Sequence, residues 1–381
     1  MKIVFVSNYL NHHQIPFCLA MQKLTKDNFY FIAMEEMTEE RKNMGWQLKE
    51  NYSFHIEMRD NRELAQTLVD EADVVICGGS AYMWFIRKRV ECDKLTFWYS
   101  ERIYKKGLWQ ALSPRGFYYM TRDHGRYRKK NLYLLCASAY APLDYALTGS
   151  YIGKTYKWGY FPMFNKYNIE QLIEQKRKDR INILWVSRFI DWKHPEYPIK
   201  LAEKLKSNNY NFHLTMIGNG VLLDESIKVI EEKGLSDVIT VLGGLTPQQV
   251  RGHMEDANIF IFTSDFNEGW GAVLNEAMNS GCAVVTSHAI GATPYLVNDG
   301  VNGLIYKNGQ FDDFEKKVET LVKDCEFSEK LGRKAYHTIS TEWNADEAAR
   351  RLFNLCESKL SNKQYSVETG PCSKARIKTG I

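Results

Sequence analysis

The sequence has no closely spaced pair of cysteines and no apolar run long enough to cross a bilayer. Its eight cysteines stand far apart, none in a Cys-x-x-Cys pair, which argues against a zinc cluster or a thioredoxin-like redox site. A transmembrane helix needs about 18 consecutive apolar residues, and no segment reaches that length. Most of the cysteines lie in apolar runs, as expected for reduced thiols of a cytosolic protein. The start, MKIVFVSNYLNHHQ, turns polar too soon for a signal peptide and predicts a buried first strand.

The chain also has little net charge and no internal repeat. Fifty Lys and Arg residues against 46 Asp and Glu leave a net charge of +4, too small to indicate a nucleic-acid partner. What is present is an ordinary globular composition, 44% hydrophobic and 25% charged. Because 381 residues exceed one ordinary core, we expect two domains of roughly 150–200 residues each.

Short continuous apolar runs alternate with helical patterns through the first half of the chain. The predicted strands are KIVFVS, NFYFIAM, YSFHIEM, DVVICGG, LTFWYS and NLYLLCAS, with a helix over HQIPFCLAMQKL after the first. Runs of this kind suit parallel strands that are buried on both faces. The alternation predicts a doubly wound α/β sheet in an N-terminal domain over 1–165.

A polar, charge-rich helical stretch, NKYNIEQLIEQKRKDR, interrupts this pattern and predicts an interdomain linker over 166–180. The α/β pattern then restarts with the strands INILWVSR, FHLTMIG, VITVLGG, ANIFIFTS, CAVVTS and GLIY, separated by helical segments. The sequence therefore predicts a second Rossmann-like domain over 181–343. In such folds, ligands bind in a cleft at the carboxyl ends of the strands.

The end of the chain has two parts. A final helix is predicted over 344–360, where Asn344 and Glu347 form an approximate capping box. The tail over 361–381 is polar and lacks periodicity, so we expect it to be disordered.

Two cations follow the first strand of the second domain. Arg188 comes directly after ILWVS, and Lys193 lies five residues further on. At the carboxyl end of a parallel strand both would point into the cleft, where the fork of arginine and the point charge of lysine suit phosphate oxygens. The alternative is that both form surface ion pairs with Asp191 or Glu196.

Glycines mark two other strand ends. Gly218 and Gly220 follow the next strand and would let the backbone approach a ligand closely, although a plain turn before a helix has the same pattern. Further on, Gly269, Trp270 and Gly271 open the helix AVLNEAMNSG. The backbone amides freed there, together with the helix dipole, form an anion site that fits a diphosphate.

Two glutamates bracket this glycine-rich turn. Glu268 precedes the helix and can face a neutral polyol such as a sugar. Glu276 lies within the first two turns and can accept hydroxyl hydrogen bonds, as acidic residues do from a ribose in dinucleotide folds. Taken singly, Glu276 could be an exposed helix residue and Glu268 a helper of the N-cap. Together with Arg188 and Lys193, they predict a nucleotide-sugar site.

These residues resemble the motifs of the retaining GT-B glycosyltransferases, specifically of the large family four. That family carries Gly-Arg-hydrophobic, then Lys, then Gly-x-Gly, then two Glu separated by seven residues and followed by Ala-Met. The counterparts here are Ser187-Arg188-Phe189, Lys193, Gly218-Asn219-Gly220, and Glu268 to Glu276 followed by Ala277-Met278. The resemblance spans residues 181 to 360.

The resemblance implies transfer of a sugar from a nucleotide donor with retention of anomeric configuration. Arg188 and Lys193 would hold the diphosphate and neutralise its charge as it leaves. Glu268 would place the donor sugar, and Glu276 would hold the ribose. Members usually need no metal or other cofactor, and this sequence has no Asp-x-Asp motif. The resemblance also implies two Rossmann-like domains that face a cleft, with the final helix crossing back to the first.

Two loops depart from the family pattern. The first strand–helix loop, SNYLNHHQIP, lacks the glycine pair often found near the donor phosphate, and Asn11, His12 and His13 stand there instead. A histidine there could contact the donor or face solvent at the helix start. The segment after CAVVTS has Tyr295 where the family often has a glutamate. In the N-terminal domain, Glu101 after LTFWYS is a candidate contact for the acceptor.

Two other classes of protein match parts of the sequence. TGSYIGKT and VDEADVVI are reminiscent of a nucleic-acid-stimulated ATPase, but the P-loop glycine is displaced by one residue and the motif order is reversed. A two-domain α/β protein can also clamp a sugar or nucleotide without transferring it. The paired glutamates beside a cationic diphosphate site favour the transferase, and we expect no nucleic-acid partner.

A basic stretch lies between Arg87 and Lys130, where thirteen Lys or Arg against four acids give a net charge of +9. Within it, KKGLWQALSPRGFYYM mixes cations with Trp, Leu and aromatic residues, which suits an anionic membrane surface. A solvated basic face over a partly buried helix is the alternative. Relatives in the family often glycosylate lipid-linked acceptors at the cytoplasmic face of a membrane. We therefore expect a cytoplasmic, peripherally membrane-bound enzyme of cell-surface polysaccharide synthesis, with a UDP-sugar as the default donor and a glycan or lipid-linked acceptor.

Overall fold

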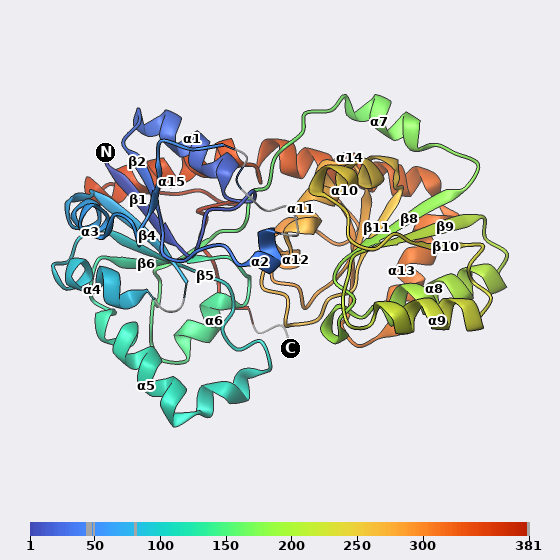
Figure 1. Cartoon of the computed structure of the whole chain (residues 1–381), viewed down its shortest axis with the longest axis horizontal. Helices are drawn as coiled ribbons and strands as arrows, with labels where there is room; N and C mark the ends of the chain where they lie inside the picture. The colour runs from blue at the N-terminus through green and yellow to red at the C-terminus, as the bar shows by residue number, and fades with distance from the viewer. Residues whose placement is uncertain (43–47, 49, 80–81, 379–381) are drawn as a thin grey trace. The chain divides into compact units, whose positions relative to one another are not determined.

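The computed structural model describes residues 1–42, 48, 50–79 and 82–378. The chain divides into two compact units, Met1–Met163 with Glu342–Ile381, and Phe164–Thr341 (Figure 1). Each unit is built on one parallel sheet with helices packed on its faces. The predicted fold class, an α/β chain with two Rossmann-like units, is confirmed.

In the described residues, the first unit holds a seven-stranded sheet in the order β3-β2-β1-β4-β5-β6-β7. The strands are β1 (Ile3–Ser7), β2 (Phe29–Ala33), β3 (His55–Glu57), β4 (Val74–Gly78), β5 (Thr96–Ser100), β6 (Leu132–Cys136) and β7 (Thr155–Lys157). The helices are α1 (Ile15–Thr25), α2 (Glu39–Arg41), α3 (Arg62–Glu71), α4 (Met83–Glu91), α5 (Pro114–Asp123), α6 (Ala141–Ala146) and α15 (Ala345–Leu360), with 3-10 turns η2 (Leu108–Leu112) and η3 (Gly125–Tyr127). Every residue of β1 and β4 is buried, as their continuous apolar sequences predict.

The second unit holds a six-stranded sheet in the order β10-β9-β8-β11-β12-β13 across the described residues. The strands are β8 (Ile181–Val186), β9 (Phe212–Ile217), β10 (Ile239–Val241), β11 (Ile259–Phe262), β12 (Ala283–Ser287) and β13 (Leu304–Tyr306). The helices are α7 (Ile169–Lys176), α8 (Glu196–Ser207), α9 (Leu223–Glu232), α10 (Pro247–Asp256), α11 (Ala272–Asn279), α12 (Thr293–Leu296), α13 (Phe311–Lys323) and α14 (Cys325–Thr341), with the 3-10 turn η4 (Asp191–Lys193). Among the described residues, no helix combines the length and the apolar character needed to cross a bilayer.

The segment predicted as a linker, 166–180, is part of the second unit. It forms helix α7, whose Leu172 and Ile173 are buried. Lys176 at its end is 2% exposed and donates from Nζ to the carbonyl oxygens of Met254 and Ala257, at 2.7 and 2.6 Å. The linker interpretation was wrong because most of the charged residues of this helix face solvent while a narrow apolar stripe packs inward.

The end of the chain belongs to the first unit. Helix α15 begins after Asn344, whose side chain accepts from the backbone N–H of Glu347 at 2.9 Å, and it lies alongside α1 (Figure 1). The expectation of a disordered tail over 361–381 was wrong for the residues up to 378, and 379–381 lie outside the described residues. Cys372 and Ser373 are buried against β7. Backbone pairing with an edge strand, which needs no sequence periodicity, orders this polar segment.

Deleting residues 364–381 is expected to lower the unfolding free energy of the first unit by about 4 kcal/mol, at about 1 kcal/mol for each hydrogen bond lost. Those bonds join Lys157 N to Ser373 O (2.7 Å), Cys372 N to Lys157 O (2.8 Å), Ala375 N to Thr155 O (3.1 Å) and Thr155 Oγ1 to Ala375 O (2.7 Å). Urea unfolding measures the change. Deleting only 376–381 keeps all these partners and is the control; equal stability of the two deletions would contradict the assignment.

Candidate active site

The residues predicted to bind the donor meet at one edge of the second unit's sheet. The strand order reverses direction between β8 and β11, and in open parallel sheets a ligand crevice forms at this switch point, beyond the carboxyl ends of the strands. The loop after β8 carries Arg188 and Lys193, and the loop after β11 carries Glu268. The topology therefore brings together side chains that are far apart in sequence.

Hydrogen bonds tie these two loops together. The backbone N–H of Asp265 donates to the carbonyl oxygen of Trp192 at 3.1 Å. Thr263 donates from Oγ1 to the carbonyl oxygen of Lys193 at 2.6 Å, and it accepts from the indole N–H of Trp185 at 2.8 Å. Since Thr263 and Trp185 are buried, the backbone that carries Lys193 is held in place before any ligand arrives.

Lys193 and Glu268 form an ion pair between the loops. Their side chains are only 10% and 12% exposed, and the Lys193 ammonium lies 4.3 Å from the centroid of the Trp192 ring. Such a pair is largely removed from water, so each charge depends strongly on the other. The acid in this pair is Glu268, whereas the alternative considered from the sequence was Asp191 or Glu196.

Arg188 is the exposed cation of the same edge. Its guanidinium carbon lies 5.7 Å from the centroid of the Trp192 ring. In the part of the chain that the structure describes, Arg188 forms no ion pair, so the surface pairing considered from the sequence is absent there too. The planar fork of this side chain is thus available to an anionic ligand.

Gly218 and Gly220 serve loop packing. The backbone N–H of Gly218 donates to Gly243 O, in the loop after β10, at 2.7 Å. The backbone N–H of Phe189 donates to Asn219 O at 2.9 Å, so the turn after β9 packs against the loop after β8. A β-carbon at position 218 would lie 1.8 Å from the carbonyl oxygen of Ser187, and the Gly218 φ is +145°. These glycines hold the Arg188 loop in position, whether or not a ligand also approaches them.

In the turn before α11, the Trp270 side chain packs into the core and the backbone lies at the helix start. Gly269 is buried, and Gly271, with a φ of +89°, is the N-cap of α11 and lies against the Phe262 ring. The Trp270 side chain is fully buried and donates its indole N–H to Asn275 Oδ1 at 2.9 Å. Trp270 therefore anchors the turn through the core, and only the backbone around it is placed to meet a ligand.

Glu276, on α11, is held by an arginine that the sequence analysis did not identify. Arg251, on α10, donates from Nη1 to the backbone oxygen of Glu276 (3.0 Å) and to Asn279 Oδ1 (3.1 Å), and its Nη2 lies 3.9 Å from Glu276 Oε1. Burial raises the pKa of the Glu276 carboxyl, and Arg251 opposes that rise. Glu276 is 18% exposed, so it is not the freely solvated helix residue of the alternative interpretation.

In the first unit, the loop after β1 carries Asn11, His12 and His13. Asn11 is buried and structural, since its Oδ1 accepts from the N–H of His13 at 3.0 Å. Burial lowers the pKa of His12 to about 4 and that of His13 well below its usual value. The two imidazole rings are 3.8 Å apart, and neither side chain is highly exposed.

Glu101 lies at the end of β5 in the same unit. Its Oε1 accepts from the Tyr160 hydroxyl at 3.0 Å, and its Oε2 pairs with Lys105 at 3.0 Å. Because the Tyr160 ring also lies 6.4 Å from that of His13, one tyrosine connects the two candidate regions. The unit thus brings His13 and Glu101 to a common edge, as their positions after β1 and β5 predict.

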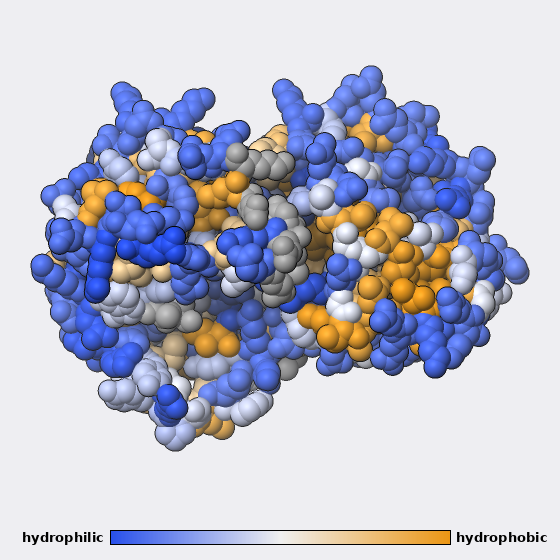
Figure 2. Space-filling view, in the orientation of Figure 1, coloured by the Kyte–Doolittle hydropathy of each residue, from blue (hydrophilic) through white to orange (hydrophobic). Residues whose placement is uncertain are grey.

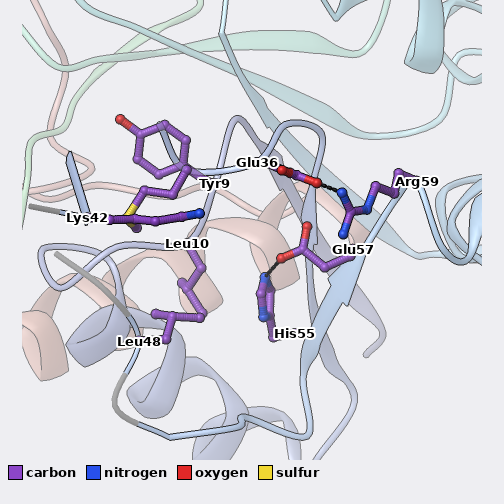
Figure 3. Close-up of a pocket in the computed structure, with 9 residues that line it drawn as sticks. Tyr9, Leu10, Glu36, Lys42, Leu48, His55, Glu57 and Arg59 are labelled. Atoms are coloured by element: carbon purple, nitrogen blue, oxygen red, sulfur yellow. Dashed lines mark ion pairs between the residues drawn. The ribbon is translucent and has the colours of Figure 1, made fainter. Parts of the chain in front are cut away.

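A pocket of about 420 Å³ opens beside the loops that follow β1 and β2 in the first unit (Figure 3). The ion pair of Glu36 with Arg59 lines it, and His55 Nε2 lies 3.3 Å from Glu57 Oε1. The remaining lining residues are Tyr9, Leu10, Met37, Lys42 and Leu48. None of the four residues that the sequence proposed in this unit lines the pocket. No group of three or more His, Cys, Asp or Glu among the described residues is arranged to hold a metal ion.

Comparison with known proteins relates the second half of the chain to a family of enzymes. Residues 168–338 match the model of the family described as glycosyl transferases group 1. The poly(ribitol-phosphate) alpha-N-acetylglucosaminyltransferase of Staphylococcus aureus is 28% identical over 176 residues, 45% of this chain and 34% of the relative. The N-acetylgalactosamine-N,N'-diacetylbacillosaminyl-diphospho-undecaprenol 4-alpha-N-acetylgalactosaminyltransferase of Campylobacter jejuni is 32% identical over 160 residues, 42% and 40% of the two chains. The matched stretch spans less than half of the length of either relative.

Solved structures share the fold over almost the whole chain. The crystal structure of Anabaena Alr3699/HepE in complex with UDP has a TM-score of 0.69 at 16% identity, covering 94% of this chain and 100% of that one. The apo form of the lipopolysaccharide outer core galactosyltransferase WaaB has a TM-score of 0.67 at 17% identity, covering 94% and 100%. The chain therefore shares the GT-B fold of these structures over almost its whole length, and the match to the glycosyl transferases group 1 family lies in residues 168–338. The matched residues lie within the second unit, Phe164–Thr341.

Proposed function

We propose that the chain is a retaining glycosyltransferase that moves a sugar from a nucleotide-diphosphate donor, a UDP-sugar by preference, to a glycan or lipid-linked acceptor in cell-surface polysaccharide synthesis. The observation that carries the proposal is the Lys193–Glu268 pair at the switch point of a glycosyl transferases group 1 domain. Support for the donor comes from the UDP bound to the Anabaena protein. Support for the acceptor comes from the polymer and the lipid diphosphate in the names of the two relatives.

In this proposal the protein's own cations neutralise the leaving diphosphate, with no metal or other cofactor. Arg188 and Lys193 bind its oxygens beside the amides at the start of α11. The bond between the sugar C1 and the diphosphate oxygen breaks, and the acceptor oxygen bonds to C1 on the same face. The acceptor's proton passes to a departing phosphate oxygen. Glu268 orients the donor sugar, and Glu276 accepts from the ribose hydroxyls.

Thermal unfolding with UDP, GDP, CMP, ADP and ATP, each with and without magnesium, tests the donor site. A nucleotide that binds only the folded state stabilises it by about 2.7 kcal/mol at about a hundred times its dissociation constant. We expect one nucleoside diphosphate, UDP first, to raise Tm regardless of magnesium, and Glu276→Ala to weaken the effect. A magnesium-dependent ATP shift that ignores this substitution would instead indicate an ATPase.

Turnover separates a transferase from a binding module. With a panel of UDP-sugars and a polyprenyl-diphosphate-linked or polyol-phosphate acceptor, we expect UDP release that depends on the acceptor. The product's anomeric proton coupling would show retention. Nucleotide binding without transfer to any acceptor would favour the non-catalytic sugar- or nucleotide-binding alternative. We also propose a cytoplasmic location, peripheral to a membrane.

Arg251→Met is expected to weaken UDP binding by about 10- to 100-fold, because hydrogen bonds to charged groups contribute about 1.5–3 kcal/mol. Burial raises the pKa of Glu276 and Arg251 lowers it, so without Arg251 that pKa rises further. An ionised Glu276 accepts hydrogen bonds from two ribose hydroxyls. The affinity for UDP therefore falls as the pH drops through the pKa of Glu276. In the variant this fall begins at a higher pH.

Calorimetric titration with UDP from neutral to mildly acidic pH measures both effects. Arg177→Met, which removes a surface arginine paired with Glu329, is the matched control and should bind UDP as wild type does. An Arg251→Met profile with a lower affinity but an unshifted pH dependence would mean that Arg251 acts on folding alone.

A further inference from the structure

The basic stretch predicted over Arg87–Lys130 is not one continuous surface. Arg89 is 2% exposed and donates to four main-chain carbonyl oxygens. Arg102 is buried beside Asp144, with Nη2 at 3.8 Å from Oδ1. Arg87 pairs with Asp123 at 3.4 Å. These cations hold the first unit together, so any surface role must fall to the remaining ones.

Exposed apolar side chains gather on η2 and α5 instead. The residues in question, which we call the η2–α5 surface, are Lys106, Trp109, Leu112, Arg115, Phe117 and Tyr118. Trp109 is 67% exposed, Leu112 83%, Phe117 51% and Tyr118 61%. Met120 is the one residue of α5 that is buried. Figure 2 shows pale and orange side chains over α5, at the bottom of the view. The apolar residues of this helix are therefore mostly unused by the core.

The segment that carries these side chains contains cations and no acids until Asp123, although Lys105 and Arg122 pair with Glu101 and Asp123. From residue 102 to 122 the sequence holds five Lys or Arg and no Asp or Glu. Lys106 and Arg115 are exposed, and neither forms an ion pair with any described residue. The Trp109 indole N–H already donates to the carbonyl oxygen of Lys106 at 2.9 Å, so the ring can leave water without an unsatisfied donor.

We propose that the η2–α5 surface docks on an anionic lipid membrane, with Trp109, Leu112 and Phe117 entering the interfacial layer and Lys106 and Arg115 meeting the lipid headgroups. Aromatic and leucine side chains beside cations are the combination that binds at such interfaces. A second copy of the chain is a poor partner, because a two-fold contact would place cations opposite cations. The inference extends the proposed function by naming the membrane that presents its acceptor.

Flotation of the full chain with vesicles tests this docking. The probes are vesicles of phosphatidylcholine alone and of phosphatidylcholine with phosphatidylglycerol, at physiological ionic strength. We expect binding only to the anionic vesicles, and a blue shift of tryptophan fluorescence that Trp109→Phe reduces. Trp109→Ser with Phe117→Ser, or Lys106→Glu with Arg115→Glu, should each lower the apparent affinity by about tenfold or more.

Matched controls lie outside the surface. Trp84→Ser removes an aromatic side chain that is 52% exposed on α4, and Lys88→Glu with Lys129→Glu makes the same charge change elsewhere in the basic stretch. Both should float as wild type does. The proposal is overturned if these controls lose binding as strongly as the surface variants, or if wild type ignores anionic vesicles. It is also overturned if soluble polyphosphate is bound while vesicles are not, which would indicate a polyanion site.

UDP binding, measured on the same variants, keeps this inference separate from the proposed function. We expect the surface variants to bind UDP as wild type does, since their substitutions lie outside the second unit. Lost flotation with intact UDP binding is the expected pattern. If the wild type floats with vesicles but does not bind UDP, the proposed donor site is wrong and the membrane contact is still supported.

Discussion

Replacing Lys193 by alanine is expected to reduce glycosyl transfer by about 100- to 1,000-fold, the range found when one preorganised charge-stabilising donor is removed from an active site. The Thr263 hydroxyl holds the backbone of Lys193, and the Lys193 ammonium lies over Trp192, so this charge is fixed in position and its removal leaves Arg188 as the other cation identified at this edge. The substitution also leaves Glu268, 12% exposed, without its counter-charge. That carboxylate would then repel the incoming diphosphate. Initial rates with saturating donor measure the loss.

Glu268→Gln separates the two halves of the ion pair. It removes the negative charge but keeps the shape, so Lys193 is freed for phosphate. We expect UDP binding to be retained or improved while sugar transfer is lost, because the donor sugar is no longer oriented. Lys200→Ala, at an exposed position of α8, is the surface control. A Lys193→Ala enzyme with near wild-type turnover would show that Lys193 takes no part in the reaction.

Gly218→Ala is expected to lower the unfolding free energy of the second unit by about 2–4 kcal/mol, since an alanine with positive φ and a backbone clash combines two strongly destabilising effects. The new β-carbon would lie 1.8 Å from the carbonyl oxygen of Ser187, so the loop that carries Arg188 must move. A displacement of about 1 Å at a reacting centre can cost about 100-fold in rate. UDP affinity and the denaturant concentration at the unfolding midpoint should therefore decrease together.

Gly252→Ala provides the matched control for this glycine. Gly252 lies within α10, and a β-carbon there meets no atom within 4 Å. In a helix the change from glycine to alanine stabilises by about 0.5–1 kcal/mol. We expect a slight gain in stability and unchanged UDP binding. If Gly218→Ala behaved in the same way, the tight packing of the two loops would not matter for the site.

Most strands, and the position of Arg188, Lys193 and Glu268 at the carboxyl ends of two of them, could be predicted because continuous apolar runs and the residues after them are local signals. Lys193 and Glu268 were both identified, yet their pairing was not, since it depends on β8 and β11 being neighbours in the sheet. Arg251 was missed for the same reason, because only the packing of α10 against α11 places it beside Glu276. No sequence spacing encodes that contact.

The failures arose where polarity was taken as a sign of disorder or exposure. Helix α7 was interpreted as a linker, although Arg177 and Glu170 pair with Glu329 and Arg333 of α14. The strand β7, with the sequence TYK, is too short and too polar to be recognised, so the segment that pairs with it was missed as well. Trp270 was predicted among the donor-binding residues; its side chain is buried and donates to Asn275, so only its backbone can meet a donor.

The discontinuity of the first unit has a consequence for how the protein is made. Helix α15, which packs on α1, and the residues that pair with β7 all emerge after the second unit has been synthesised. The second unit is one continuous segment, Phe164–Thr341, so it can complete its fold on the ribosome while the first unit still lacks its last helix. This chain connectivity favours the opposite of the usual order, in which the N-terminal domain folds first. Until synthesis ends, the α1 face and the β7 edge remain open to chaperones and to misassociation.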